Sequence, residues 1–231
     1  PEVVGEGETP AIHYYDEAQG QWINISGTVS GASVVVQVDH FTKFAVLAAE
    51  KEQEQTLTDI TGHWAYEMIN KLVGMGCISG YPDGTFKPDN AITRAEFTVV
   101  LVKAFGLENT GGPLFTDTTG HWAKDYIETA ASHGIVNGYD DGTFGPDDLI
   151  TREQLAVMLV RVAELTPLAG ELRFADSASI SPWAAEGLAT AIGYGIIKGY
   201  PDQTIKPGGS ATRAEAVTVI VNTLNVLNGL T

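Results

Sequence analysis

Apolar residues recur at a helical period along most of the chain, and the same pattern appears three times. The members of this stripe are Trp64, Met68, Ile69, Leu72 and Val73; then Trp122, Ile127, Ala130 and Ala131; then Trp183, Leu188, Ala191 and Ile192. Each stripe ends at a Gly followed by an apolar residue, which predicts a left-handed helix cap at Gly76, Gly134 and Gly195. We expect a helix beginning near each Trp, with the Trp side chain packed mainly in the core and an edge left for a ligand.

A second helix is predicted in each copy. Its start is marked by a Thr with Glu or Gln three residues later, the pattern of a capping box, at Thr93, Thr151 and Thr212. The apolar residues expected to be buried along it are Phe97, Leu101, Ala104 and Phe105; then Leu155, Leu159, Val162 and Ala163; then Ala216, Ile220, Thr223 and Leu224. Each copy is therefore expected to be a helix, a loop and a helix.

The loop between the two helices reads Gly-Tyr-x-Asp-Gly-Thr-Phe in the first two copies and is altered in the third. Its Asp-Gly pair predicts a tight turn with a positive φ angle. The loop ends in an apolar residue that we expect to fold back on the core: Phe86, Phe144 or Ile205.

The landmarks of the three copies keep one spacing. A Trp lies 16 residues before the first loop Gly and an Arg lies 14 residues after it, and the copies are offset by 58 and 61 residues. Three landmarks in a fixed order predict one structural unit used three times, with any binding site repeated as well.

The first fifty residues have a different pattern. Short apolar runs separated by Gly predict strands at 11–15, 21–26, 33–38 and 44–47. So few strands make a marginal fold, so we interpret residues 1–49 as a β-rich segment, the tail of a larger surface-protein domain or a small β subdomain. The remaining boundaries are a polar linker at 50–56 and the three copies at 57–108, 109–166 and 167–231.

Charge and composition exclude several function classes. The net charge of −16 argues against a nucleic-acid partner, because neutralising phosphates needs a basic face. No apolar run approaches the length of a membrane span, so membrane insertion is not expected. The single cysteine, Cys77, occupies an apolar position that is Ile135 or Ile196 in the other copies, and we expect it in the core.

One residue in each second helix is unexpected. Arg94, Arg152 and Arg213 lie in the first helical turn, where the helix dipole disfavours a cation by about 0.3–1 kcal/mol. Two explanations remain open. Each Arg forms a salt bridge with a nearby Asp or Glu, or it forms an anion site in which free N–H groups of the helix N-terminus and the guanidinium bind a carboxylate.

The Trp, the Gly-Tyr-x-Asp-Gly-Thr-Phe loop and the Thr-Arg-Ala-Glu tetrad resemble the S-layer homology (SLH) domain over about three quarters of the chain. The resemblance implies a mainly α fold: a pseudo-threefold prism of three helix-loop-helix repeats around a central helical bundle, with grooves between neighbouring repeats. It implies a non-enzymatic, extracellular module that anchors exported bacterial proteins to the cell wall or S-layer. The implied ligand is a secondary cell-wall polysaccharide, often ending in pyruvylated N-acetylmannosamine, and no cofactor is implied.

The resemblance also implies the groove residues. Carried over to each copy they are Asp59, Trp64, Gly80, Tyr81 and Arg94; Asp117, Trp122, Gly138, Tyr139 and Arg152; and Asp176, Trp183, Gly199, Tyr200 and Arg213. The third copy departs from the pattern at Gln203 and Ile205, and Glu153 places a negative charge beside Arg152. We therefore expect unequal grooves, with those built around Arg94 the best.

The sequence also allows one alternative to this function. The alternative is a protein–protein assembly module whose grooves bind neighbouring surface-layer proteins. Residues 83–89 superficially suggest a calcium-binding loop. They lack the alternating acidic ligands and the closing Glu of an EF-hand, so calcium binding is not expected. His63 and His121 have no partners at zinc-ligand spacing and are expected to make polar contacts at helix starts. The Asp pairs fall in turns, so no catalytic or metal residue is assigned.

Overall fold

The structure, a computed structural model, describes residues 8–16, 21–24, 28–30, 33–35 and 44–50, and residues 57–229 except 169 and 171. The chain divides into two compact units, Pro1–Glu54 and Gln55–Thr231. The predicted linker falls largely on residues 51–56, which lie outside the described residues. The domain boundaries within the repeats stay predictions.

The first unit is built from antiparallel strands, as predicted. Strand β1 (Glu8–Asp16) lies between β2 (Gln21–Asn24) and β5 (Phe44–Glu50) in a three-stranded sheet. A two-stranded sheet pairs β3 (Thr28–Ser30) with β4 (Ser33–Val35), and β3 was not predicted.

The second unit contains the repeats, and its described residues form two α-helices per repeat. The first helices are α1 (Tyr66–Gly74), α3 (Lys124–Ser132) and α5 (Ala185–Gly193). The second helices are α2 (Arg94–Ala104), α4 (Arg152–Val162) and α6 (Arg213–Leu227). A short 3-10 helix, η1 (Ser177–Ser179), precedes α5. The mainly α fold class is therefore confirmed.

The helix ends form as the sequence predicts. All three second helices begin with a complete capping box, in which the Thr side chain accepts from the N3 backbone and the N3 side chain accepts from the Thr backbone N–H. Gly76, Gly134 and Gly195 have φ angles of 68°, 67° and 73° after the first helices. The residues that follow donate back to the helix, for example from Cys77 N to Leu72 O at 3.0 Å, which closes a Schellman motif.

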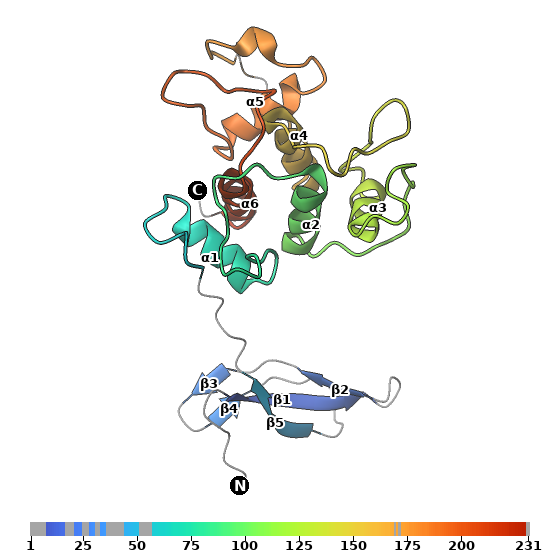
Figure 1. The fold of residues 1–231 in the computed structure, drawn as a ribbon, viewed down its shortest axis with the longest axis vertical. Coiled ribbons are helices and arrows are strands. Elements are labelled where there is room, and N and C mark those ends of the chain that lie inside the picture. The colour runs from blue at the N-terminus through green and yellow to red at the C-terminus, as the bar shows by residue number, and fades with distance from the viewer. Residues whose placement is uncertain are drawn as a thin grey trace. The chain divides into compact units, whose positions relative to one another are not determined.

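The repeats pack on one another in a cycle (Figure 1). Helix α3 packs on α2 and α5 packs on α4, so the first helix of a repeat lies against the second helix of the preceding repeat. Helix α1 of the first repeat packs on α6 of the third and completes the cycle, and α6 also contacts α2 and α4. A repeat thus buries its apolar face against a neighbour, which is why one copy alone lacks a complete core.

Backbone hydrogen bonds follow the same cycle at the entrance to the second helices. Ile92 N donates to Ala211 O, Ala211 N donates to Ile150 O, and Ile150 N donates to Ile92 O, at 3.0–3.1 Å. Each bond joins two different repeats. The ring therefore fixes the three helix N-termini next to one another.

The predicted core is confirmed, with one correction. The loop-end residues Phe86, Phe144 and Ile205 are fully buried, and Cys77 is buried among other apolar side chains. The expectation that the Trp side chains pack mainly in the core is wrong. Trp64, Trp122 and Trp183 are 63 %, 64 % and 58 % exposed because the first helices begin two residues after each Trp, outside the packed stripe.

Candidate anion-binding site

The N-termini of the second helices do not present free N–H groups, contrary to the sequence-based expectation. The N–H of Arg94 donates to Asp148 O at 2.8 Å and that of Ala95 donates to Pro146 O at 3.0 Å, while Glu96 N donates to the Thr93 hydroxyl. The other two helices make the equivalent bonds to the next repeat. These donors are used in holding neighbouring repeats together, so binding of an anion must depend on side chains.

Each Arg side chain reaches into the loop of another repeat. The Nε of Arg94 donates to Phe144 O at 2.9 Å, and its guanidinium lies over the rings of Tyr139 and Phe144. Arg152 and Arg213 repeat this contact with Ile205 O and Phe86 O. All three are 5–6 % exposed. Cation–π contact and the hydrogen bond to a carbonyl together compensate for the unfavourable position in the first helical turn.

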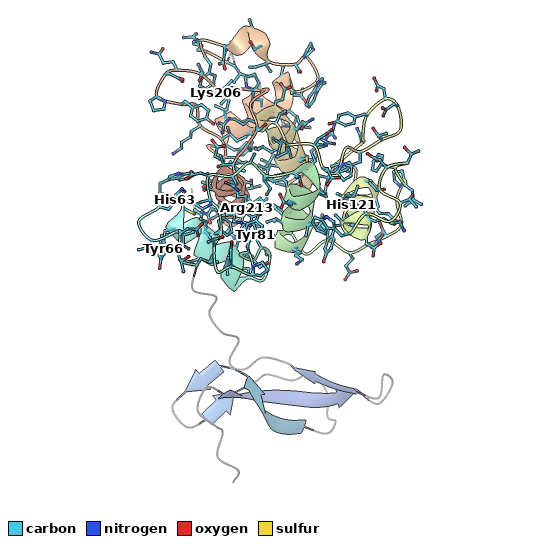
Figure 2. All side chains as sticks on the ribbon, viewed as in Figure 1. His63, Tyr66, Tyr81, His121, Lys206 and Arg213 are labelled. Atoms are coloured by element: carbon cyan, nitrogen blue, oxygen red, sulfur yellow. The ribbon has the colours of Figure 1, made fainter. Side chains whose placement is uncertain are left out.

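The candidate residues therefore combine across repeats rather than within one. Arg94 lies with Tyr139, Arg152 with Tyr200, and Arg213 with Tyr81. Figure 2 shows Arg213 and Tyr81 together between α6 and α1. The groups of residues that the sequence assigned copy by copy are thus redistributed, because the Arg of one repeat meets the loop of the next.

The carboxylates of Asp59, Asp117 and Asp176 hold the loops in place. Asp59 accepts from the N–H groups of Phe86 and Lys87, both at 2.7 Å. The other two make the same pair of bonds to residues 144–145 and 205–206. The carbonyl that accepts from each Arg belongs to the loop residue held in this way. These Asp side chains therefore position the partner of the Arg.

The same hydrogen bonds predict acid sensitivity. Burial opposes ionisation of Asp59, but the N–H groups of Phe86 and Lys87 outweigh it and lower the pKa below the ordinary 3.8. Hydrogen bonds from Thr85 likewise lower the pKa of Asp83. Because the pKa is lower in the folded state, the stabilisation is complete above about pH 4 and is lost as pH falls below that. We expect a lower Tm at pH 3 than at pH 7 by calorimetry, and a smaller difference in Asp59→Asn. An unchanged difference in that variant would argue against the carboxylate as a source.

The three Arg residues differ in their ionic partners. Arg152 Nη1 lies 2.9 Å from Glu215 Oε1, and Arg213 Nη1 lies 3.7 Å from Glu96 Oε1. Among residues 57–168, 170 and 172–229, Arg94 has no salt bridge within 4.0 Å. The salt-bridge explanation thus holds for two of the three Arg residues. Burial lowers the pKa of Arg94, against the effects of Tyr139, Asp148 and Asp117, yet the group keeps its charge, as Arg does in proteins.

A cavity of about 480 Å³ opens beside the guanidinium of Arg94. Its lining comes from all three repeats: Arg94 from the first, Gly138, Tyr139 and Arg161 from the second, and Trp183 from the third. The sequence reasoning missed Gln154 and Arg161, which also line it. Arg161 lies seven residues after the capping Gln154 and therefore on the same face of α4. This spacing could have identified Arg161 as a candidate.

Two other side chains near this region have structural partners. Glu153 is buried, and its carboxylate accepts from the N–H and hydroxyl of Ser181, at 3.0 and 2.8 Å. Its charge is used in fixing the start of the third repeat. His63 and His121 accept from Ala65 N and Ala123 N, so their predicted polar contacts at helix starts are confirmed. No group of three potential metal-ligating side chains comes together within the described part of the chain.

The described residues form a repeat-built helical module in which the buried guanidinium of Arg94 lines a cavity, and comparison with known proteins agrees with a repeat module of this kind. The S-layer homology domain model matches residues 56–98, 114–156 and 173–217, more than half of the chain. The chain belongs to the S-layer homology domain family. Members of this family are cell-wall anchoring modules, and the location is extracellular, at the cell wall. No helix in the described ranges is both long and apolar enough to cross a membrane.

Named relatives include anchoring, surface-layer and enzyme proteins. The chain is 32 % identical over 93 % of its length to an amylopullulanase of Thermoanaerobacterium thermosulfurigenes. It is 37 % identical over 66 % to the cellulosome-anchoring protein of Acetivibrio thermocellus, and 34 % identical over 86 % to S-layer protein EA1 of Bacillus anthracis. The matches span 12 %, 36 % and 22 % of these relatives. The chain thus corresponds to a minor part of each.

Proposed function

We propose that the chain anchors its parent protein by binding an anionic secondary cell-wall polysaccharide, with the acidic sugar held in the cavity beside Arg94. The observation that carries this proposal is that the buried guanidinium of Arg94 lies on the wall of a cavity of about 480 Å³ and has no salt bridge within the described residues. A desolvated cation gains more from a carboxylate than an exposed one does. The volume lies in the range of small-ligand pockets, about 300–1,000 Å³.

The remaining lining residues suit a sugar that carries a carboxylate. A pyruvyl ketal on N-acetylmannosamine supplies that carboxylate, and we assign its recognition to Arg94. Tyr139 offers a half-exposed ring and hydroxyl, and Trp183 an exposed indole that can cover an apolar sugar face. Gly138 brings backbone close to the ligand. Asp117 acts indirectly by holding the loop that orients Arg94.

The test is pull-down of the chain by purified wall material. Sedimentation with peptidoglycan that carries the polysaccharide is expected, and it should be lost after the polysaccharide is extracted. Mild acid, which hydrolyses the pyruvyl ketal and leaves the polymer, should also abolish it. Undiminished sedimentation with the extracted material would overturn the proposal.

The exposed Trp of the third repeat provides a second prediction. Because an aromatic contact contributes about 0.5–1.5 kcal/mol, we expect Trp183→Ala to weaken binding up to about tenfold. Stability should hardly change, since the indole is 58 % exposed. Titration with wall polysaccharide followed by calorimetry measures the effect. Trp64→Ala is the matched control, because Trp64 is equally exposed but does not line the cavity.

One observation favours the alternative, assembly with neighbouring surface-layer proteins. Trp64 and Trp122 are about two-thirds exposed and lie outside the cavity, and exposed aromatic side chains are common at protein interfaces. Association that depends on protein concentration, in the absence of glycan, would support this function. Sedimentation equilibrium of the isolated chain makes that measurement.

A further inference from the structure

In the third and first repeats, the capping-box residue at helix position N3 meets the Arg of the preceding repeat in the cycle. In α6 this residue is Glu215, whose Oε2 accepts from Thr212 N at 3.0 Å and completes the cap. Its other oxygen, Oε1, accepts from Arg152 Nη1 at 2.9 Å and from the Tyr200 hydroxyl at 2.6 Å. Burial of Tyr200 and its hydrogen bond to Glu215 raise the pKa of Tyr200 to about 12. One carboxylate therefore both caps the helix and neutralises the neighbouring guanidinium.

Glu96 has the same two functions in α2. Its Oε2 accepts from Thr93 N at 3.0 Å, and its Oε1 lies 3.7 Å from Arg213 Nη1. The longer distance makes this pair looser than the one between Arg152 and Glu215. At both Arg152 and Arg213, however, a carboxylate of the chain itself stands where an acidic ligand would meet the Arg.

The groove of Arg94 has Gln154 in this position. Thr151 N donates to Gln154 Oε1 at 3.0 Å, so the cap is intact. Because the oxygen is used by the cap, the second terminal atom is the amide nitrogen, which is a donor and carries no negative charge. Gln154 and Arg94 line the same cavity. This groove therefore offers two kinds of donor and no capping carboxylate.

A second cation adds to the difference from the groove of Arg152, whereas the corresponding residue of α2, Lys103, is also a cation. Arg161 of α4 lines the cavity and donates from Nη1 to Ile135 O at 3.1 Å, which leaves its charge at the cavity wall. The corresponding residue of α6 is Asn222, which makes the same contact to Ile196 O without a charge. The groove of Arg152 thus combines the shorter ion pair with a neutral residue at this second position.

We propose that the capping-box residue at helix position N3 decides which groove accepts an acidic sugar. Gln154 keeps the groove of Arg94 open, while Glu215 and Glu96 act as built-in carboxylates that occupy the ligand's place at Arg152 and Arg213. The inference rests on the proposed function, since it names the residue that selects among the three repeat-related grooves. One acidic sugar binds per chain, and Gln154 is a specificity-determining residue.

The decisive variant is Gln154→Glu. Glu caps α2 and α6 at the equivalent positions, so folding should be preserved, and a new ion pair with Arg94 should raise Tm. The probe is the methyl glycoside of N-acetylmannosamine bearing a 4,6-pyruvyl ketal, titrated calorimetrically. We expect wild type to bind close to one probe molecule per chain, and Gln154→Glu to bind about 30-fold more weakly, the loss of one charge-assisted contact.

The reverse variants test the other grooves. Glu96→Gln and Glu215→Gln keep the cap, as Gln154 does, and each should raise the stoichiometry toward two probe molecules per chain. Glu96→Gln should disturb folding less than Glu215→Gln, because the ion pair of Glu96 is longer and more exposed than that of Glu215. The same probe without the ketal is the control for charge recognition, and it should bind weakly to every variant.

The outcomes separate the two hypotheses. Three equivalent sites in wild type, or unchanged affinity in Gln154→Glu, would overturn the selection by Gln154 and leave the anchoring function intact. Absence of binding by wild type to both the probe and pyruvylated wall material would overturn the proposed function, and this inference with it.

Discussion

Replacing Arg94 with Ala is expected to weaken binding to the wall polysaccharide by more than about 100-fold, because it removes the cavity cation that forms no salt bridge in the part of the chain that the structure describes. A charge-assisted contact in a desolvated site contributes about 1.5–3 kcal/mol, and removal of the ring-stacked guanidinium also deforms the cavity. Cosedimentation with wall material over a range of concentrations gives the affinity.

Arg152→Ala and Arg213→Ala are the matched controls for this experiment. Each of these residues makes the same Nε bond to a loop carbonyl as Arg94 and also stacks on a Tyr ring. Each also has a Glu partner that its removal would leave unpaired, so these two variants should lose about 2–4 kcal/mol, at least as much as Arg94→Ala. Their binding should change less than about threefold, measured well below Tm. Equal losses of binding in all three variants would contradict the assignment of the ligand to one groove.

Gly138→Ala is expected to lower the free energy of unfolding by about 3–5 kcal/mol, the largest stability effect we predict. Gly138 has a φ of 70°, and a Cβ there would lie 2.7 Å from Thr143 O and collide with the ring of Phe115. Phe115 is 6 % exposed and packs against Phe144, so it has little room to move. Urea unfolding followed by circular dichroism measures the loss.

Gly134→Ala separates the cost of the left-handed backbone conformation from the cost of the clash with Phe115. Gly134 has a nearly identical φ of 67°, but nothing lies within 4 Å of a Cβ added there. This variant should lose only the cost of the left-handed conformation, about 1–2 kcal/mol. If both variants lost the same amount, the contact with Phe115 would not be the constraint at Gly138. A larger loss in Gly138→Ala than in Gly134→Ala would show that Gly138 is needed for packing, whatever contact it makes with a ligand.

Local elements could be predicted because their causes lie within a few residues. The capping boxes at Thr93, Thr151 and Thr212 depend on a Thr and a Glu or Gln three positions apart. The glycine caps depend on the absence of a Cβ at a positive φ. Burial of Phe86 and Phe144 follows from their place after a turn that returns the chain to the core.

The Trp positions show where this reasoning fails. Periodicity assigned Trp64 to the apolar stripe because it lies four residues before Met68. The helix begins only at Tyr66, so the periodicity does not extend to the Trp, and the side chain is exposed. An apolar residue just before a helix start can be either buried or exposed, and the neighbouring repeat decides which.

From the sequence alone we could determine the family, the three-fold repetition, the helices with their caps and the three unusual Arg residues. Each of these features depends on the spacing of residues that lie close together in the sequence. The tertiary structure decided which residues share a groove. Arg94 shares a cavity with the loop of the second repeat and the Trp of the third, and the capping residue beside that cavity is Gln154, which carries no negative charge. Such partnerships depend on how repeats pack against one another, because charges that are 60 residues apart along the chain interact only when folding brings them within a few ångströms.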